Sequence, residues 1–352
     1  MESSGLTKFA YHALQQSKSI AGFAHKEIST KVMEIVFPES KATNFPIQRD
    51  LLIELRKAMS KLENIDWQEA SEGIYPVNQL FEAPWLEWAR KYPLVWLDMP
   101  STWNRRKRQD TRDLPKEIDL ALYPDYYLQN FHHQTDGYLS EHSAELYDIQ
   151  VEILFNGTAD SMRRRVISPL KKGLQVFNNK NNSQLRILDV ATGTGRTLKQ
   201  IRGSLPKVQL FGNDLSGAYL KQASKYLSKG EGEIVQLSKE NAERTSFMAN
   251  NMHGITCVYL LHELPRETRQ NVINECFRML EPGGIFVLAD SIQLSDSPKF
   301  KLVMENFHKV FHEPYYRDYI IDDIDKRLAD AGFINVYAKS YFMTRVWAAK
   351  KP

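Results

Sequence analysis

Two glycines and one carboxylate mark the stretch of this sequence that is best suited to chemistry. Gly193 and Gly195 follow an apolar run that ends at Val190, and Asp214 closes the next apolar run along the chain. Glycine lets the backbone turn sharply and lets a ligand come close, because no Cβ stands in the way. A carboxylate at the tip of the neighbouring strand can accept hydrogen bonds from both hydroxyls of a ribose. Together these residues predict a nucleoside-binding edge.

The elements that must position these residues follow one another closely. Residues 185–190 predict a buried strand, residues 196–203 a helix, and residues 208–212 a second strand that runs into the carboxylate. The helix presents free N–H groups to whatever lies above the strands. A dinucleotide site would need a third glycine in the pattern G-x-G-x-x-G, but Leu198 occupies that position. A nicotinamide-dependent oxidoreductase is therefore disfavoured.

The motifs in this unit resemble those of a known family. The pattern D-x-x-x-G-x-G at 189–195 resembles motif I of the class I S-adenosylmethionine-dependent methyltransferases, and G-x-D-x-S at 212–216 resembles their second motif. The motif sequence most resembles that of the methyltransferase-type-11 group, which includes the quinone-biosynthesis C-methyltransferases. The later segments that fit the family in order are E-N-A-E at 240–243, the apolar run at 255–261 and L-E-P-G-G at 280–284.

The resemblance covers about residues 166–350 and implies a fold. It implies an α/β, Rossmann-like sheet of seven mostly parallel strands, with strand seven antiparallel, preceded by a mainly helical N-terminal cap. We expect residues 1–165 to form this substrate-shaping cap and residues 166–352 to form the methyltransferase domain. Helices are predicted in the cap at residues 6–37 and 48–62, where apolar residues recur every three or four positions.

The resemblance also implies a cofactor, S-adenosyl-L-methionine, and the residues around it. Asp189, Gly193 and Gly195 would surround its methionine part, Asp214 would hold the ribose, and Arg163 is the candidate partner of its carboxylate. The remaining predicted cofactor contacts are Ala191, Leu215, Asn241, Ala242 and Leu260.

Methyl transfer from a sulfonium is an in-line displacement, so the protein mainly has to align the reacting atoms. A general base is needed only if the acceptor must lose a proton. The candidates are His262, His133 and Tyr138, with His132 and Asp290 behind them. The adjacent pair His132 and His133 lacks a third ligand at a suitable spacing, so no metal site is expected.

Three segments before residue 166 stand out by composition. Residues 80–103 hold four of the six tryptophans, which predicts a helical core or, alternatively, a substrate-facing wall. Residues 104–112 are a basic run, read first as a solvated loop and second as an anion contact. Residues 123–154 gather tyrosines, histidines and a glycine break, which favours a lid over the site or, alternatively, a hydrogen-bonded connection between the domains. Residues 159–175 predict a helix with Arg163, Arg164 and Arg165 mostly outward.

Length, charge and cysteine content limit the classes of protein and of partner that remain. The chain has 352 residues, a net charge of +3 and two cysteines, which suits a cytoplasmic protein without a disulfide framework. That charge gives little support for a nucleic-acid partner, and no apolar run is long enough for a membrane span. We expect a small aromatic or apolar acceptor. A protein side chain remains the alternative, as does a cofactor-binding module without catalysis. The oligomeric state is not readable.

Overall fold

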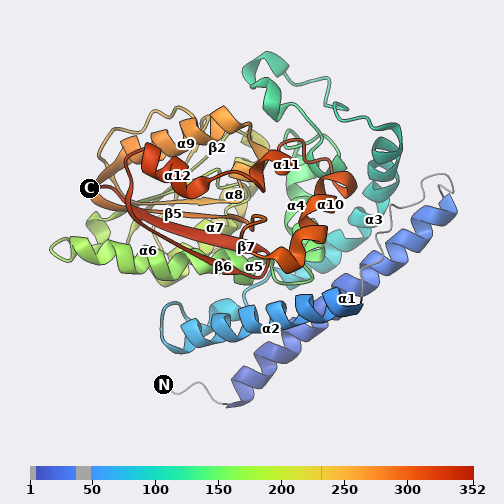
Figure 1. Ribbon diagram of the computed structural model, residues 1–352, viewed down its shortest axis with the longest axis horizontal. Coiled ribbons are helices and arrows are strands. Elements are labelled where there is room, and N and C mark those ends of the chain that lie inside the picture. Colours follow the sequence, from blue (N-terminus) through green and yellow to red (C-terminus); the bar gives the residue numbers. More distant parts are fainter. Residues whose placement is uncertain (1–4, 37–48, 231) are drawn as a thin grey trace.

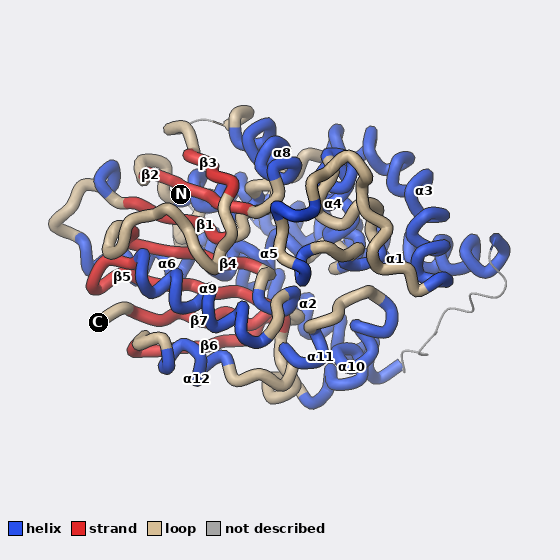
Figure 2. Tube along the Cα trace, turned by 90° about the horizontal axis from the view of Figure 1, so that it is seen from above, coloured by secondary structure: helices blue, strands red, loops and turns tan. Residues whose placement is uncertain are grey.

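The described part of the chain, residues 5–36, 49–230 and 232–352 of a computed structural model, is built on one sheet. Seven strands lie in the order β3-β2-β1-β4-β5-β7-β6 (Figure 2). The strands are β1 (Arg186–Val190), β2 (Gln209–Asp214), β3 (Gln236–Lys239), β4 (Met252–Val258), β5 (Leu280–Ser291), β6 (Ile334–Tyr341) and β7 (Thr344–Lys350).

The direction of each strand confirms the predicted fold class. β1 runs parallel to β2 and to β4, β2 is parallel to β3, and β4 is parallel to β5. β7 is antiparallel to both of its neighbours, β5 and β6. The carboxyl ends of the five parallel strands therefore meet at one edge, which is where ligands of open α/β sheets bind.

Alternation along the strands divides the core into two layers. Ile187 and Leu188 are neighbours on β1 and are both fully buried, yet they belong to two different apolar clusters. Successive side chains of a strand point to opposite faces, so both faces of this sheet are covered. Figure 1 shows α6 on one side of the sheet and α9 and α12 on the other.

In the second half of the chain the helices alternate with the strands, and the first half is mainly helical. In the first half they are α1 (Gly5–Val36), α2 (Arg49–Ser71), α3 (Trp85–Arg108), α4 (Glu141–Leu154), α5 (Ala159–Arg163) and α6 (Ile167–Leu174). In the second half they are α7 (Arg196–Ser204), α8 (Gly217–Leu227), α9 (Arg266–Met279), α10 (Lys301–Val310), α11 (Tyr316–Tyr319) and α12 (Ile324–Asp330). The helical N-terminal region expected from the sequence is confirmed, and α1, α3 and α4 gather at one end of the sheet (Figure 2).

The basic run at 104–112 differs from its prediction. It is not a loop at its start, because α3 continues to Arg108 despite Pro93 and Pro100 inside the helix. Arg105 is buried and donates from Nε to the carbonyl of His133 at 3.0 Å, while Lys107 and Arg108 are exposed. One arginine of the run is therefore a structural cation that ties α3 to the segment after it.

The prediction that Arg163, Arg164 and Arg165 face outward is wrong, since all three are buried. Arg164 donates from Nε to Asp66 of α2 at 2.9 Å, and Arg165 donates to Glu69 at 2.6 Å. The predicted single helix is in fact α5, a short 3-10 turn and α6, so the outward face assumed for the arginines does not exist. Buried arginines require acidic partners, and those of Arg164 and Arg165 come from far earlier in the chain.

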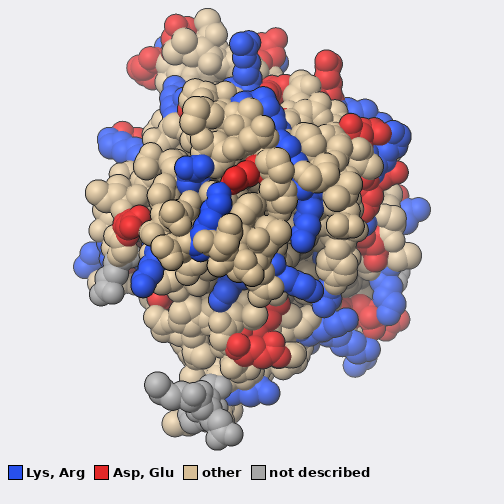
Figure 3. Space-filling view, turned by 90° about the vertical axis from the view of Figure 1, so that its left-hand side faces the viewer, with Lys and Arg blue, Asp and Glu red and all other residues tan. Residues whose placement is uncertain are grey.

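The outer surface is ordinary in charge, with lysines, arginines and acidic residues interspersed over the face shown in Figure 3. α1 buries Tyr11, Gln15 and His25 against the rest of the protein, whereas Phe9 and Ile35 are 71% and 78% exposed. Within the described ranges, no helix has both the length and the apolar character that crossing a bilayer demands.

Candidate functional site

A tight turn follows β1 and opens a pocket at the carboxyl edge of the sheet. Ala191, Gly193 and Gly195 all have a positive φ, of 53°, 56° and 81°, which the two glycines adopt without strain. A Cβ added to Gly193 would meet no heavy atom within 4 Å, because it would point into open space. Gly195 instead lies under α8, where an added Cβ would stand 3.1 Å from Leu227. The first glycine thus borders a cavity and the second allows close packing.

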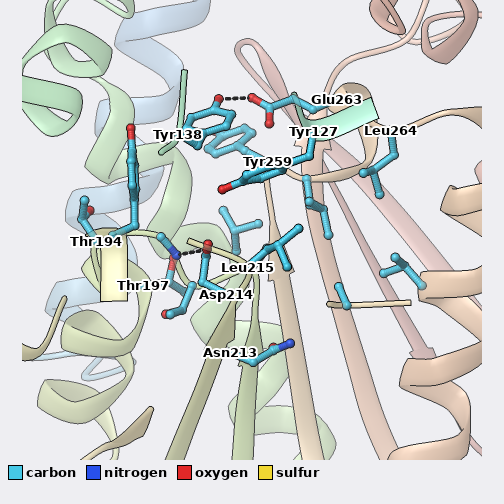
Figure 4. A pocket seen from close by; sticks show the side chains of 18 of the residues that line it. Tyr127, Tyr138, Thr194, Thr197, Asn213, Asp214, Leu215, Tyr259, Glu263 and Leu264 are labelled. Carbon is cyan, nitrogen blue, oxygen red and sulfur yellow. Dashed lines mark hydrogen bonds between the residues drawn. The ribbon is translucent and has the colours of Figure 1, made fainter. Parts of the chain in front are cut away.

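Asp214, the last residue of β2, stands at the centre of this pocket (Figure 4). Its Oδ2 accepts the backbone N–H of Gly193 at 2.8 Å, and its Oδ1 accepts that of Ser216 at 2.8 Å. Burial raises the pKa of this carboxyl to about 6, although the two N–H groups favour its charged form. A carboxylate offers about four acceptor positions. Two are used here, which leaves capacity for a pair of ligand hydroxyls.

The pocket encloses about 960 Å³ of empty space, a figure that includes its open mouth. Asn213, beside Asp214, lines it, and both amide atoms of its buried side chain lack a hydrogen-bond partner. Buried polar atoms are nearly always paired, by protein or by something bound. The open space at Gly193, the free acceptor capacity of Asp214 and the unpaired amide all fit an adenosine-containing cofactor in this pocket.

The remaining predicted cofactor residues fall into two groups. Those that line the pocket are Arg163, Ala191, Gly193, Asp214, Leu215, Asn241, Ala242 and Leu260. Asn241 uses its Oδ1 to accept the N–H of Glu243 at 2.9 Å, so one lone pair of that oxygen already serves the local turn.

Asp189 and Gly195 are not among the lining residues. Asp189 is 1% exposed and accepts hydrogen bonds from Thr192 at 2.8 Å and Thr256 at 2.6 Å. Asp189 therefore stabilises the glycine turn through its hydrogen bond with Thr192 and does not line the pocket itself.

Arg163 brings a positive charge to the methionine end predicted for the cofactor. It is 7% exposed, lines the pocket and donates from Nη1 to Asp160 at 3.2 Å. Arg196, which begins α7, also donates to Asp160, and its guanidinium lies 5.3 Å from the ring centroids of Trp88 and Tyr226. Both cations are thus fixed by the same carboxylate.

Residues 123–154, expected to form a lid, contribute four tyrosines to the pocket: Tyr126, Tyr127, Tyr138 and Tyr147. The ring of Tyr138 lies 5.4 Å from that of Tyr219 on α8, in an edge-on arrangement. Ser216, at the start of α8, donates from its hydroxyl to the carbonyl of Tyr138 at 2.6 Å. Figure 4 shows Tyr138 and Tyr127 on the side of the pocket away from Asn213. By contrast, none of the tryptophans in residues 85–103 is a lining residue, which supports the core interpretation of that segment.

The three predicted catalytic residues lie at different depths. Tyr138 lines the pocket, and its hydroxyl donates a short hydrogen bond to Glu263 (Figure 4). His262 lies behind the lining, with Nδ1 2.6 Å from Asp290. Burial lowers its pKa but the Asp290 carboxylate outweighs this and raises it to about 10, so His262 holds its proton at neutral pH. His133 is buried away from the lining, and burial lowers its pKa to about 4.

Glu263 is a pocket residue that the sequence reasoning did not single out. It follows His262 in a 3-10 turn, η8 (Leu261–Glu263), after β4, and it lines the pocket where His262 does not. Its Oε1 also lies 3.7 Å from Nε2 of His132. A signal existed, because this acidic residue lies two positions after the apolar run at 255–261 in the sequence. The sequence favoured the adjacent His262 as the candidate general base instead.

Comparison with known proteins agrees with this geometry. A protein-family profile described as a methyltransferase domain matches residues 187–284, which run from β1 into β5 and include the glycine turn, Asp214 and Glu263. The chain contains a class I S-adenosylmethionine-dependent methyltransferase domain. S-adenosyl-L-methionine is accordingly the methyl donor that this domain accommodates.

Two relatives and one solved structure illustrate how far the similarity extends. The ubiquinone/menaquinone biosynthesis C-methyltransferase of Desulfotalea psychrophila is 30% identical over 145 residues, 41% of this chain and 53% of the relative. The demethylmenaquinone methyltransferase of Thermotoga maritima is 28% identical over 152 residues, 43% of this chain and 59% of the relative. Human N-acetylserotonin methyltransferase in complex with S-adenosylmethionine has a TM-score of 0.45 and 12% identity, covering 71% of this chain and 66% of that one. The chain thus spans little more than half the length of the curated relatives it matches.

Proposed function

We propose that this protein transfers the methyl group of S-adenosylmethionine to a small aromatic or apolar acceptor. The observation that carries the proposal is a single pocket with two ends of different chemistry. One end holds Asp214 and the glycine turn, and the other holds Tyr138 and Glu263. A cofactor seated at the first end leaves the second for an acceptor.

The cofactor supplies a methyl group on a sulfonium, and the chain's own residues orient the partners. Asp214 is suited to fix the ribose, while Arg163 offers a cation to a carboxylate at the opposite side of the turn. Tyrosine rings cover the pocket and limit its water, which favours displacement by aligning the reactants. Glu263, already accepting the hydroxyl of Tyr138, is the group best placed to accept or steer a proton of the acceptor.

A small acceptor is favoured over a protein side chain by this cover. The tyrosines over the pocket belong to the chain itself and are anchored to it, for instance through the bond from Ser216 to the carbonyl of Tyr138. Aromatic walls suit flat or apolar ligands. The two relatives are named for ubiquinone, menaquinone and demethylmenaquinone chemistry, which lies in the same class of acceptor.

Replacing Asp214 with alanine tests the cofactor part of the proposal. We expect S-adenosylhomocysteine to bind the Asp214→Ala variant about 10- to 100-fold more weakly, because a charged hydrogen bond is worth about 1.5–3 kcal/mol. Isothermal titration calorimetry would measure the dissociation constants. Asp330→Asn, an exposed change on α12, is the matched control and should bind as the wild type does. Equal affinity in Asp214→Ala would refute the assignment of the ribose site.

Labelled methyl donor tests the acceptor part. Incubation with panels of quinols, phenols and amines, and with fractionated cell extract, should place the label in the small-molecule fraction. Label recovered in the protein fraction would identify a side-chain methyltransferase. Tight cofactor binding without any transfer across the panels and extract would favour a binding module without catalysis.

A further inference from the structure

Three ligand-type side chains meet beyond the Glu263 end of the pocket. His132 comes from the 3-10 turn η4 (Phe131–His133), Glu263 from η8, and Glu313 from the loop between α10 and α11. One nitrogen or oxygen of each lies within 4.8 Å of the others. His132 Nε2 is 3.0 Å from Glu313 Oε1 and 3.7 Å from Glu263 Oε1. No two of these residues are close in sequence, so folding alone assembles them.

Glu313 is the unusual member of this cluster. Its side chain is completely buried, yet neither carboxylate oxygen makes a hydrogen bond. Burying a carboxyl group without a partner is costly, and such groups are normally paired or bound to an ion. The contact with His132 supplies proximity but no hydrogen bond of good geometry. The carboxylate therefore has unused acceptor positions that face the other two ligands.

The charges around Glu313 leave an excess of acid. The charged groups that act most strongly on it are His132, His262, Glu263 and Asp290. Asp290 is already occupied, since it accepts the backbone N–H of Leu261 at 2.7 Å and contacts Nδ1 of His262 at 2.6 Å. Three carboxyl groups, those of Glu263, Glu313 and Asp290, thus lie near only two imidazoles, those of His132 and His262, in a buried space. A bound cation would supply the missing positive charge.

The backbone at the histidine is held in an uncommon shape. His132 has φ 55° and ψ 16°, and His133 has φ 57°, so two successive non-glycine residues occupy the left-handed region. Such conformations cost free energy and concentrate where a side chain must be aimed precisely enough to bind or react. Here the turn directs Nε2 of His132 toward the two carboxylates.

We propose that His132, Glu263 and Glu313 bind one divalent transition-metal cation such as Mn²⁺, Zn²⁺ or Co²⁺. One imidazole with two carboxylates is a ligand set these ions accept. Ligands about 2.1 Å from such an ion, at angles of roughly 90–110°, lie about 3.0–3.4 Å apart. The separation of His132 and Glu313, 3.0 Å, falls in that range, and that of His132 and Glu263, 3.7 Å, lies slightly above it. Because Glu263 also lines the pocket, the ion would fix the orientation of that carboxylate beside the acceptor.

Metal content and spectroscopy of the full chain test the proposal. The protein, purified without chelator and then stripped with EDTA, would be titrated with Mn²⁺, Zn²⁺ and Co²⁺ while thermal unfolding is followed. We expect one equivalent to bind and to raise the melting temperature, and Co²⁺ to give visible absorption bands of a protein-bound ion. No increase in melting temperature and no cobalt bands with the wild type would overturn the site.

Two variants separate the site from general effects. Glu313→Gln removes a ligand and a buried charge, so it should fold without metal and bind the ion at least about 100-fold more weakly, since even outer-shell partners change affinity by about 10- to 100-fold. His132→Gln should do the same from another segment. Glu305→Gln, which changes a partly exposed acid on α10, should bind metal as the wild type does. Unchanged metal affinity in both ligand variants would also refute the site.

The same samples distinguish this inference from the proposed function. Glu313 and His132 do not line the cofactor pocket, so S-adenosylhomocysteine should bind both ligand variants with wild-type affinity. Failure of the metal titration with intact cofactor binding would remove the metal site alone. Failure of cofactor binding in the wild type would remove the proposed function alone.

Discussion

At the scale of single residues, Asp214 links protonation to ligand binding. Its pKa is raised to about 6 by burial, above the ordinary value for aspartate, so the empty pocket takes up a proton near mildly acidic pH. A protonated carboxyl can no longer accept two hydroxyl hydrogen bonds. If Asp214 binds the ribose as we propose, the state that does so is the ionised one, which dominates above that pKa.

We accordingly expect the affinity for S-adenosylhomocysteine to be flat between pH 7 and 8 and to fall below about pH 6. The dissociation constant should rise by about tenfold for each further pH unit, because binding then competes with one proton. Calorimetry across this range would measure it. Asp214→Asn, which cannot titrate, should bind weakly at every pH and lose this slope. A slope that persisted in the variant would assign the effect to another group.

The sequence was sufficient to bring together the pocket residues whose position depends on local spacing. Gly193 and Asp214 could be found because a turn after one strand and the tip of the next are neighbours in any parallel pair. The cluster of His132, Glu263 and Glu313 could not, because its members are brought together only by tertiary packing. The expectation that the two adjacent histidines lack a third ligand considered spacing along the chain, whereas the candidate ligands lie on other segments.

At the scale of elements, α2 is joined to the start of the methyltransferase domain by a buried ionic network. Asp66 on α2 accepts hydrogen bonds from Arg164, Arg165, Tyr11 and Tyr75 and is wholly buried. Burial alone would raise its pKa, but the two guanidinium groups outweigh burial and hold its pKa well below the usual range. A carboxyl with a lowered pKa stabilises the fold above its unfolded pKa of about 3.9 and loses that contribution as the pH falls further.

Asp66→Asn should therefore destabilise the protein strongly. Removing one partner from a buried ion pair typically costs about 3–5 kcal/mol, since the arginines would remain buried without their counter-charge. Urea unfolding at pH 7 would measure the loss. The difference from wild type should shrink as the pH falls below about 4, because Asp66 then takes up a proton in the unfolded chain while it stays ionised in the folded one. Glu72→Gln, an exposed change just after α2, should alter stability by less than about 0.5 kcal/mol. A loss of under 1 kcal/mol in Asp66→Asn would show that the network is dispensable.

Elements were predicted well where hydrophobic periodicity is strong. α1 and α7 were expected within a residue or two of their observed ends. Hydrophobic periodicity predicted the wrong exposure for the arginines in residues 159–175. A buried arginine cannot be distinguished from an exposed one in the sequence until its acidic partner is known. It also gave no sign that α3 continues through Pro93 and Pro100 into the basic run.

At the scale of the whole molecule, the N-terminal helices and the sheet share apolar core. Tyr11, Trp67 and Tyr75 belong to the same buried cluster as Ile187 and Leu210 of the sheet. The division at residue 165 proposed from the sequence thus crosses a continuous core as well as the ionic network. Regions that share a core in this way are expected to unfold together.

Residues 166–352 expressed alone should therefore fail to form a stable domain, whereas the full chain should unfold in a single thermal transition. Circular dichroism and size-exclusion chromatography would show a fragment that is aggregated or lacks fixed structure, since it exposes one layer of the core. A monomeric, cooperatively melting fragment that bound S-adenosylhomocysteine normally would instead establish two independent domains.

The setting of Arg196 has a consequence for how such a protein can diversify. This residue begins α7 directly after the glycine turn, yet Trp88 of α3, Tyr226 of α8 and Asp160 of α5 enclose it. The N-terminal half therefore reaches the glycine turn that we propose as the nucleoside site. If the C-terminal half were fused to an unrelated N-terminal region, the Arg196 guanidinium would lose the side chains that surround it. New specificities are therefore more readily gained by substitutions within the existing N-terminal region than by exchange of the whole region.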